Sequence, residues 1–269
     1  MADNSYPFEV KKEGFVTWLI LNRPERRNTM DHPFFDGLVR LFQEFDEDPE
    51  VRVVIIRGEG KSFTAGIDLQ GLGSMLQGSG AASREGLKNE IRRLQKGATA
   101  IEKCRKPVIA AVHSHCIGGG VDLCCACDVR LASRDALFSI RETKMAIIAD
   151  LGTLQRLPDI IGHGWFRELA LTGRDFSAEE ALRMGFITHL CEDRDALYEE
   201  ARRVAFEIAS CSPLAVQGVK EVILFSRDHG IGPGLEYVAQ KNASALQSED
   251  LMEAIQAFRE KRPPDFKGN

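Results

Sequence analysis

The sequence lacks two features, a long apolar run and an excess of basic residues. No uncharged apolar segment approaches about 18 residues, the length that spans a membrane as a helix. Lys and Arg number 35 against 40 Asp and Glu, which gives a net charge of −5. Such a chain has no overall attraction for nucleic acid or for an anionic membrane. We therefore expect no membrane partner, and only a local basic patch could support a nucleic-acid partner.

Several short motifs that carry common chemistries are also absent. There is no G-x-x-x-x-G-K-[ST] phosphate loop, no G-x-S-x-G nucleophile turn and no H-E-x-x-H zinc helix. The dinucleotide spacing G-x-G-x-x-G begins at Gly118 and Gly120 but meets Leu123 at its sixth position. The cysteines within 124–127 have no second pair at zinc-site spacing. We therefore predict buried thiols there and no metal site.

The cysteine count favours reduced thiols. The chain has seven cysteines, which is an odd number, and Met1–Ser5 carries neither a basic nor an apolar leader segment. Disulfide frameworks are typical of exported proteins. We therefore expect free thiols and a cytoplasmic protein.

The residues that are present have an ordinary globular composition, 43% hydrophobic and 28% charged. A length of 269 residues suits one large domain, or one domain with an appendage. Apolar, β-rich runs predict strands at residues 15–21, 51–56, 108–112, 129–132 and 137–140. Apolar residues at helical spacing in 34–45 and 87–101 predict helices between the first three strands. This alternation predicts an α/β fold with parallel strands and crossover helices.

Beyond about residue 160 the pattern becomes helical. Helices are predicted at 163–172, 177–184, 194–210, 213–226, 234–247 and 249–260. Ser177 and Glu180 have the spacing of a capping box, and Ser212-Pro213 is a typical helix start. We therefore expect a βα core over residues 1–200 and a helical region over residues 201–269.

Two turns of small residues could each direct a backbone N–H at one oxygen atom. Phe63–Leu69 follows the predicted strand at 51–56, and Ile117–Asp122 contains three glycines at the start of a short apolar helix. An oxygen bound at the second turn would also lie at a helix N-terminus, where free N–H groups and the helix dipole favour negative charge.

With these turns, the chain resembles the enoyl-CoA hydratase/isomerase (crotonase) superfamily over almost its whole length. The matching segments are Leu21–Pro24, Phe63–Leu69, Pro107–Val112, Gly118–Leu123, Cys127–Arg130, Gly152–Pro158 and Phe258–Phe266. The resemblance implies a crotonase-like spiral of ββα units, with residues 201–269 as a helical trimerisation region. It also implies a homotrimer or a dimer of trimers.

The same resemblance implies an acyl-CoA thioester substrate, with coenzyme A as part of that substrate and no separate cofactor. In the family the amides that bind the thioester oxygen correspond to Ala65 and Gly119, which form an oxyanion hole. The backbone of Ala65, Gly66, Ile67, Asp68 and Leu69, together with Gly119, would contact the substrate. Arg27 and Lys261 are candidate partners of the coenzyme A phosphates. The alternative is that both are surface charges that do not contact the substrate.

Three acids decide the expected reaction. Hydratases of the superfamily hold a water between two glutamates, at positions 122 and 142 here, but this chain has Asp122 beside Glu142. Position 150, usually glycine in hydratases, is Asp150. This set resembles Δ3,5-Δ2,4-dienoyl-CoA isomerases, auxiliary enzymes of fatty-acid β-oxidation. Such an isomerase removes a proton at C2 and delivers one at C6. We expect Glu142 as the base at C2, Asp150 as the acid at C6, and Asp122 to orient or tune them.

Other functions remain open from the sequence. An enoyl-CoA hydratase is the first alternative, and a Δ3,Δ2-enoyl-CoA isomerase is the next. A catalytically inactive scaffold and an RNA-binding member of the superfamily are further alternatives. The RNA alternative depends on a basic stripe formed by Lys88, Arg92, Arg93, Lys96, Lys103, Arg105 and Lys106. Residues 72–83 are expected to line the acyl end of the pocket.

Overall fold

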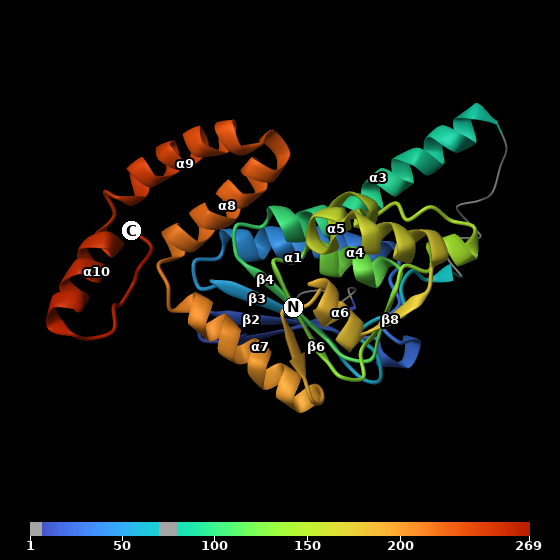
Figure 1. Cartoon of the computed structure of the whole chain (residues 1–269), viewed down its shortest axis with the longest axis horizontal. Helices are drawn as coiled ribbons and strands as arrows, with labels where there is room; N and C mark the ends of the chain where they lie inside the picture. Colours follow the sequence, from blue (N-terminus) through green and yellow to red (C-terminus); the bar gives the residue numbers. More distant parts are fainter. Residues whose placement is uncertain (1–6, 70–79) are drawn as a thin grey trace, which may run out of the picture.

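A twisted six-stranded sheet forms the centre of the molecule (Figure 1). The computed structural model describes residues 7–69 and 80–269. The strand order is β1 (Phe8–Glu13), β2 (Val16–Leu21), β3 (Val53–Gly58), β4 (Val108–Val112), β6 (Val129–Ser133) and β9 (His189–Cys191). Only the β1–β2 pair of this sheet is antiparallel. The predicted α/β fold with parallel strands is therefore confirmed.

A second, three-stranded sheet consists of β5 (His115–Ile117), β7 (Leu137–Ser139) and β8 (Asp175–Ser177). The sequence does not predict β1, β5, β8 or β9. Three of these four strands have only three residues each, which is too short for an alternating pattern to be recognised.

Alternate residues of the central strands build two separate cores, because successive side chains of a strand point to opposite faces. On one face, Val54 and Ile56 of β3 pack in a large core with α1 (His32–Glu47), α3 (Ala81–Lys103), α4 (Gly119–Ala126) and α5 (Thr153–Thr172). On the other face, Val53 and Ile55 pack against the small residues of α7 (Arg194–Ala209). Figure 1 shows α1, α4 and α5 on the side of the sheet opposite to α7.

Helix α5 begins ten residues before its predicted start at residue 163. Pro158 lies inside it, and Gly162 has a non-helical backbone with φ 74°. Both residues interrupt helical spacing in the sequence, so only the part after the kink could be recognised. The early start matters because the first residue of α5, Thr153, contacts one of the candidate catalytic acids.

The C-terminal helices lie to one side of the sheet (Figure 1). They are α8 (Pro213–His229), α9 (Ile231–Ala245) and α10 (Glu249–Glu260), and α6 (Ala178–Met184) belongs to the core. The expected boundary between residues 200 and 201 lies inside α7, which packs on the sheet up to Ala209. The helices that leave the sheet therefore begin at α8.

A buried lysine connects α8 to the sheet. Lys220 is 5% exposed, and its Nζ donates to Asp128 Oδ2 at 2.7 Å and to the Lys106 carbonyl oxygen at 3.1 Å. The same Asp128 oxygen accepts the N–H of Val108, the first residue of β4, at 2.7 Å. Burial of this pair is compensated by several hydrogen bonds, which is what a buried charge requires.

Two further expectations concern thiols and membranes. Cys124, Cys125 and Cys127 are buried in α4 and at its end, as predicted, and all seven cysteines belong to the described residues and are free. Within residues 7–69 and 80–269, no single helix is long and apolar enough to cross a membrane. The bent pair α7 and α8, whose axes meet at 104°, reaches that length and composition only when both helices are counted together.

Candidate active site

The two turns of small residues lie against each other in the fold. Thr64 forms a parallel bridge with Cys116 of β5, and the Ile117 N–H donates to the Thr64 carbonyl oxygen at 3.2 Å. Gly66 has φ +90°, and a Cβ on it would lie 2.6 Å from the Ile117 carbonyl oxygen and 3.8 Å from the Gly119 nitrogen. Only a glycine fits there, because any side chain would strain the backbone and collide with the second turn.

Ala65 cannot supply the first amide of an oxyanion hole. Its N–H donates to the carbonyl oxygen of Arg27 at 2.9 Å, and the Asp68 N–H donates to that of Met30 at 2.8 Å. The Gly66 N–H is bound to Thr64 Oγ1 at 3.1 Å. The Ile67 N–H has no acceptor among the described residues, so the expectation of Ala65 is corrected and Ile67 becomes the candidate donor of this turn. The sequence could not show this, because it does not tell which amides of the turn pair with residues 27–30.

Gly119 is the first residue of α4, so its N–H has no acceptor within the helix. A Cβ on Gly119 would lie 2.6 Å from Met30 Cε and 3.3 Å from Ile67 Cδ1. The free amide of the second turn therefore lies beside Ile67, which carries the free amide of the first. Two amides without an acceptor among the described residues, on turns that lie against each other and one of them at a helix N-terminus, form a suitable site for a negatively charged oxygen.

Asp122 lies one helical turn after Gly119 and is 1% exposed. Its Oδ1 accepts the N–H of Thr153, the first residue of α5, at 2.6 Å. Burial raises the pKa of Asp122 to about 6, and the charge of Asp150 adds to the shift. Asp122 thus joins α4 to α5 and adds a negative charge to the interior when it is ionised.

Glu142 begins a short 3-10 helix, Glu142–Met145. Its Oε1 lies 3.0 Å from the position that a Cβ on Gly118 would occupy, so its carboxyl group lies against the second turn. Its Oε2 is buried and has no hydrogen-bond partner among the described residues. Burial raises the pKa of Glu142 to about 7, with repulsion from Asp122 and Asp150 as further causes. A buried oxygen without a partner is uncommon in proteins and indicates a place for a ligand or a proton.

Asp150 precedes α5, and its carbonyl oxygen accepts Gln95 Nε2 of α3 at 2.7 Å. Burial raises the pKa of the Asp150 carboxyl group. Its charge contributes to the raised pKa of both Asp122 and Glu142. The structure therefore brings the three predicted acids into one partly buried group, where the charge of Asp150 disfavours the ionisation of Asp122 and Glu142.

Replacing Asp122 with asparagine is expected to stabilise the protein at pH 8. The folded-state pKa of about 6 lies above the usual value of 3.8. The ionised acid therefore costs the folded state up to about 3 kcal/mol above pH 6, and this cost disappears below pH 3.8, where both states are protonated. Urea unfolding of both proteins at pH 8 and pH 4 measures the difference. If the substitution raised the free energy of unfolding equally at both pH values, a cost of burying the ionised Asp122 would be contradicted.

Other predicted residues lie outside this group. Asp68 is ion-paired with Arg26, and Leu69 is 54% exposed. Arg27 and Lys261 both have left-handed backbone conformations, and nothing in the described contacts joins either to the three acids. The expectation that residues 72–83 line the acyl end falls mainly on residues outside the described ranges.

Part of the basic stripe around α3 is paired with acids, whereas Arg92, Lys96 and Lys103 are exposed. Arg93 is ion-paired with Asp36, Arg105 Nε lies 2.9 Å from Asp46 Oδ2, and Lys88 Nζ lies 3.6 Å from Glu85 Oε2. Lys106 is buried, with 6% exposure. These pairs leave less positive charge for a phosphate backbone than the sequence suggests, which weakens the RNA alternative.

Comparison with known proteins shows the family of the chain. The Enoyl-CoA hydratase/isomerase family model matches residues 11–269. A Dictyostelium discoideum protein named Delta(3,5)-Delta(2,4)-dienoyl-CoA isomerase, mitochondrial, is 47% identical over 97% of this chain and 90% of its own length. An Arabidopsis thaliana protein with the same enzyme name, peroxisomal, is 46% identical over 94% of this chain and 93% of its own. The crystal structure of a Bacillus anthracis enoyl-CoA hydratase superimposes with a TM-score of 0.91 at 33% identity, covering 98% of this chain and 100% of that one.

These relatives correct the expected compartment and establish the family. Their names place them in the mitochondrion or the peroxisome, so the expectation of a cytoplasmic protein is wrong. Free thiols do not identify the compartment, because reduced cysteines are not confined to the cytoplasm. The superposition with the hydratase confirms the crotonase fold. On the family match and these relatives, the chain belongs to the enoyl-CoA hydratase/isomerase family.

Proposed function

We propose that this protein is an isomerase that converts 3,5-dienoyl-CoA into 2,4-dienoyl-CoA. The observation that carries the proposal is the group of three acids, Asp122, Glu142 and Asp150, whose pKa values are all raised. Carboxyl groups with raised pKa values beside a glycine turn suit proton transfer to and from a thioester. The names of the relatives at 46–47% identity agree with this activity.

The backbone amides of Ile67 and Gly119 would stabilise the charge that the reaction creates. Removing a proton from C2 leaves a dienolate whose negative charge is shared by the thioester oxygen. Backbone donors are held in place by the fold, and removal of one such donor costs about 2.7–4 kcal/mol of barrier in other enzymes. The family's oxyanion hole is thereby assigned to Ile67 and Gly119.

Two carboxyl groups are needed because the two carbon atoms that exchange protons are four bonds apart. Glu142 lies against Gly118, next to the amide that would hold the thioester oxygen, so we assign it to C2. Asp150 is then the acid at C6. Repulsion between the two carboxylates favours the state in which Glu142 and Asp150 together carry one proton. The Glu142 pKa of about 7 suits a base that must take a proton near neutral pH.

The hydratase alternative requires two acids that hold one water. Asp122 is one C–C bond shorter than glutamate, about 1.5 Å, and its Oδ1 already accepts the Thr153 N–H. Asp122 is therefore poorly placed to share a water with Glu142, and Asp150 adds an acid that hydration does not need.

Incubation with two thioesters separates the two activities. With 3,5-octadienoyl-CoA, we expect rapid growth of the absorbance of the 2,4-dienoyl product. With crotonyl-CoA, we expect little loss of the enoyl absorbance, because hydration is slow. Fast hydration of crotonyl-CoA together with no dienoyl product would overturn the proposal.

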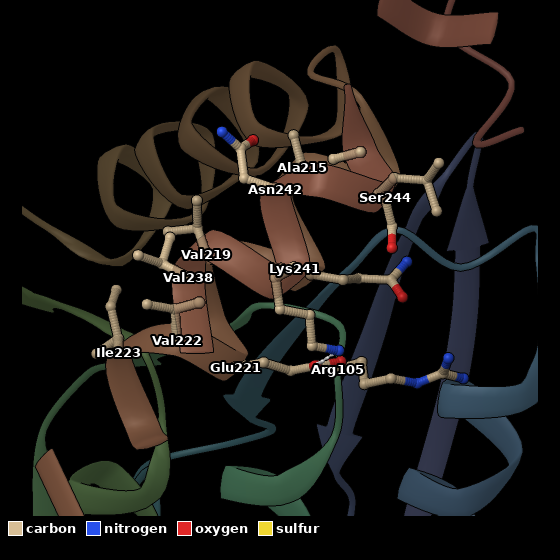
Figure 2. Close-up of a pocket in the computed structure, with 14 residues that line it drawn as sticks. Arg105, Ala215, Val219, Glu221, Val222, Ile223, Val238, Lys241, Asn242 and Ser244 are labelled. Atoms are coloured by element: carbon tan, nitrogen blue, oxygen red, sulfur yellow. Dashed lines mark ion pairs between the residues drawn. The ribbon is translucent and has the colours of Figure 1, made fainter. Parts of the chain in front are cut away.

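We propose further that α8, α9 and α10 bind other copies of the chain, in a trimer or a dimer of trimers. Ile231 and Phe258 are 81% and 85% exposed, and large exposed apolar groups indicate an interaction surface. Figure 2 shows Val219 and Ile223 of α8 beside Val238 of α9, around a cavity of about 490 Å³. Sedimentation equilibrium tests the proposal, and a monomer mass at micromolar concentration would contradict it.

A further inference from the structure

Thr64 lies between the two turns that carry the free amides. It is completely buried, and its Oγ1 donates to the Asn28 carbonyl oxygen at 2.6 Å while accepting the Gly66 N–H at 3.1 Å. Its methyl group occupies the space that a Cβ on Gly120 would need. One side chain therefore touches the first turn, the second turn and the segment that precedes α1.

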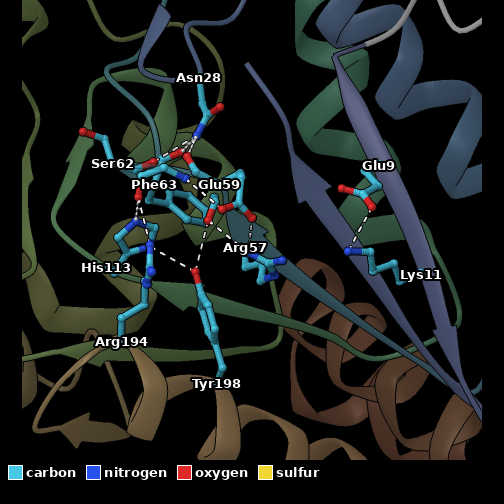
Figure 3. Close-up of polar contacts among 12 residues, drawn as sticks. Glu9, Lys11, Asn28, Arg57, Glu59, Ser62, Phe63, His113, Arg194 and Tyr198 are labelled. Carbon is cyan, nitrogen blue, oxygen red and sulfur yellow. Dashed lines mark hydrogen bonds and ion pairs between the residues drawn. The ribbon is translucent and has the colours of Figure 1, made fainter. Parts of the chain in front are cut away.

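Asn28 holds the loop that leads into the first turn. Its side chain is 2% exposed, and Nδ2 donates to the carbonyl oxygens of Glu59, Ser62 and Phe63 at 2.9, 2.9 and 3.2 Å. Figure 3 shows the Asn28 side chain directed at these three carbonyl groups. Its Oδ1 accepts the Arg23 N–H at 2.8 Å. Every polar atom of the Asn28 side chain is therefore occupied, which fixes the loop 59–63 relative to residues 23–28.

The opposite side of the same loop is held by α7 and by the end of β4. Tyr198 Oη donates to the Gly58 carbonyl oxygen at 3.0 Å, and Arg194 donates to the Gly60 carbonyl oxygen at 3.1 Å. His113 Nε2 lies 3.2 Å from the same Gly60 oxygen. Figure 3 shows these side chains reaching the loop from the side away from Asn28. The loop is thus fixed on both sides. Thr64 directly follows the loop, and its hydrogen bond to the Gly66 N–H fixes Gly66 relative to the loop.

We infer that the Thr64 hydroxyl group is a positioning element that sets the distance between the amides of Ile67 and Gly119, with Asn28 as its support. This inference rests on the proposed function, since it concerns how the same oxyanion hole is held. Thr64 touches no substrate atom in this assignment. It acts through the Gly66 N–H and the Asn28 carbonyl group.

The expected effect follows from the narrow geometry of oxyanion stabilisation. A donor must lie about 2.7–3.1 Å from the developing oxyanion, and a misplacement of about 1 Å can reduce a rate roughly 100-fold. Without the hydroxyl group, the Gly66 N–H and the Asn28 carbonyl oxygen both lose their partner and the first turn can shift. Such a shift lowers kcat more than it changes KM, because the thioester oxygen carries its full charge only in the transition state.

The test compares three variants on the full-length protein. Thr64→Val removes the hydroxyl group and keeps the branched shape, and Thr64→Ser keeps the hydroxyl group. Thr17→Val is the matched control, because Thr17 Oγ1 in β2 is buried without a hydrogen-bond partner among the described residues. Each variant is measured for thermal unfolding, for kcat and KM with 3,5-octadienoyl-CoA, and for the absorbance maximum of bound 2,4-octadienoyl-CoA. That maximum moves to longer wavelength when hydrogen bonds polarise the thioester carbonyl group.

We expect Thr64→Val to lose roughly 100-fold in kcat at similar KM, and to lose most of the wavelength shift. Thr64→Ser and Thr17→Val should keep the wild-type kcat and the wild-type wavelength shift. A folded Thr64→Val variant with wild-type kcat and wavelength shift overturns the inference, as does a Thr64→Ser variant as impaired as Thr64→Val. If Thr64→Val does not fold, the same two measurements on Thr64→Ala decide the question. A wild-type protein that neither isomerises the substrate nor shifts the absorbance refutes the proposed function itself, and this inference with it.

Discussion

Asp150→Asn is expected to lose isomerase activity roughly 10²- to 10⁴-fold, the usual contribution of a general acid, while it still exchanges the C2 hydrogen of its substrate with solvent. Asparagine has nearly the same shape as aspartate but cannot deliver a proton at C6. Glu142 remains free to remove the C2 proton and to return one from solvent. The substrate should therefore acquire deuterium at C2 in D₂O without forming product.

Glu142→Gln should lose both isomerisation and exchange, because no base then remains at C2. Mass spectrometry of 3,5-octadienoyl-CoA incubated in D₂O measures the exchange, and absorbance measures the product. Asp159→Asn is a suitable control, since Asp159 lies on α5 and lines a polar cavity together with Leu151 and Gly152. It should behave as the wild type. Exchange retained by Glu142→Gln and lost by Asp150→Asn would mean that the two acids have the opposite roles.

Replacing the Ile67 amide N–H with an ester oxygen is expected to lower kcat roughly 10²- to 10³-fold, as removal of one oxyanion donor does elsewhere. The change is made by incorporating the α-hydroxy acid analogue of isoleucine at position 67. It leaves the side chain in place and removes the Ile67 donor, which has no acceptor among the described residues; it also makes the Gly66 carbonyl oxygen, which accepts the Met30 N–H at 2.9 Å, a somewhat weaker acceptor. Folding stability should therefore change little, while the rate falls sharply.

The same change at position 65 provides the matched comparison. The Ala65 N–H donates to the Arg27 carbonyl oxygen at 2.9 Å, so an ester there removes a structural hydrogen bond worth about 1 kcal/mol. Thermal unfolding should show that loss, and kcat should fall much less than for the ester at position 67. A larger loss of kcat at position 65 than at position 67 would contradict the correction from Ala65 to Ile67.

The difference between Ala65 and Ile67 shows where prediction from the sequence reaches its limit. The turn Phe63–Leu69 is recognisable from its small residues, but each of its amides is an equal candidate for a free donor. The choice depends on pairing with residues 27–30, which lie far away in the sequence and belong to no regular strand. The sequence also gives no sign that Thr64 and Asn28 hold the two turns, because their hydrogen-bond partners are backbone groups, most of them far away in the sequence.

Elements with a complete periodic pattern could be predicted. β3 and β4 are apolar on both faces because a helix covers each side of the sheet, and α1 has its apolar residues on one face. The acids at 122, 142 and 150 were predicted from their positions in a resemblance. Their shared burial and the resulting rise of their pKa values depend on α4 and α5 packing together, which the sequence does not show.

The tight packing around the glycine turns has an evolutionary consequence. Gly66 faces the Ile117 carbonyl oxygen, a backbone atom that no substitution elsewhere can remove. Gly119 instead faces the flexible end of Met30, and Gly120 faces the methyl group of Thr64. Among homologous sequences, position 66 should therefore stay glycine whatever its surroundings. Position 119 can accept a small side chain if the ends of Met30 and Ile67 move, whereas position 120 can change only together with residues 64 and 116.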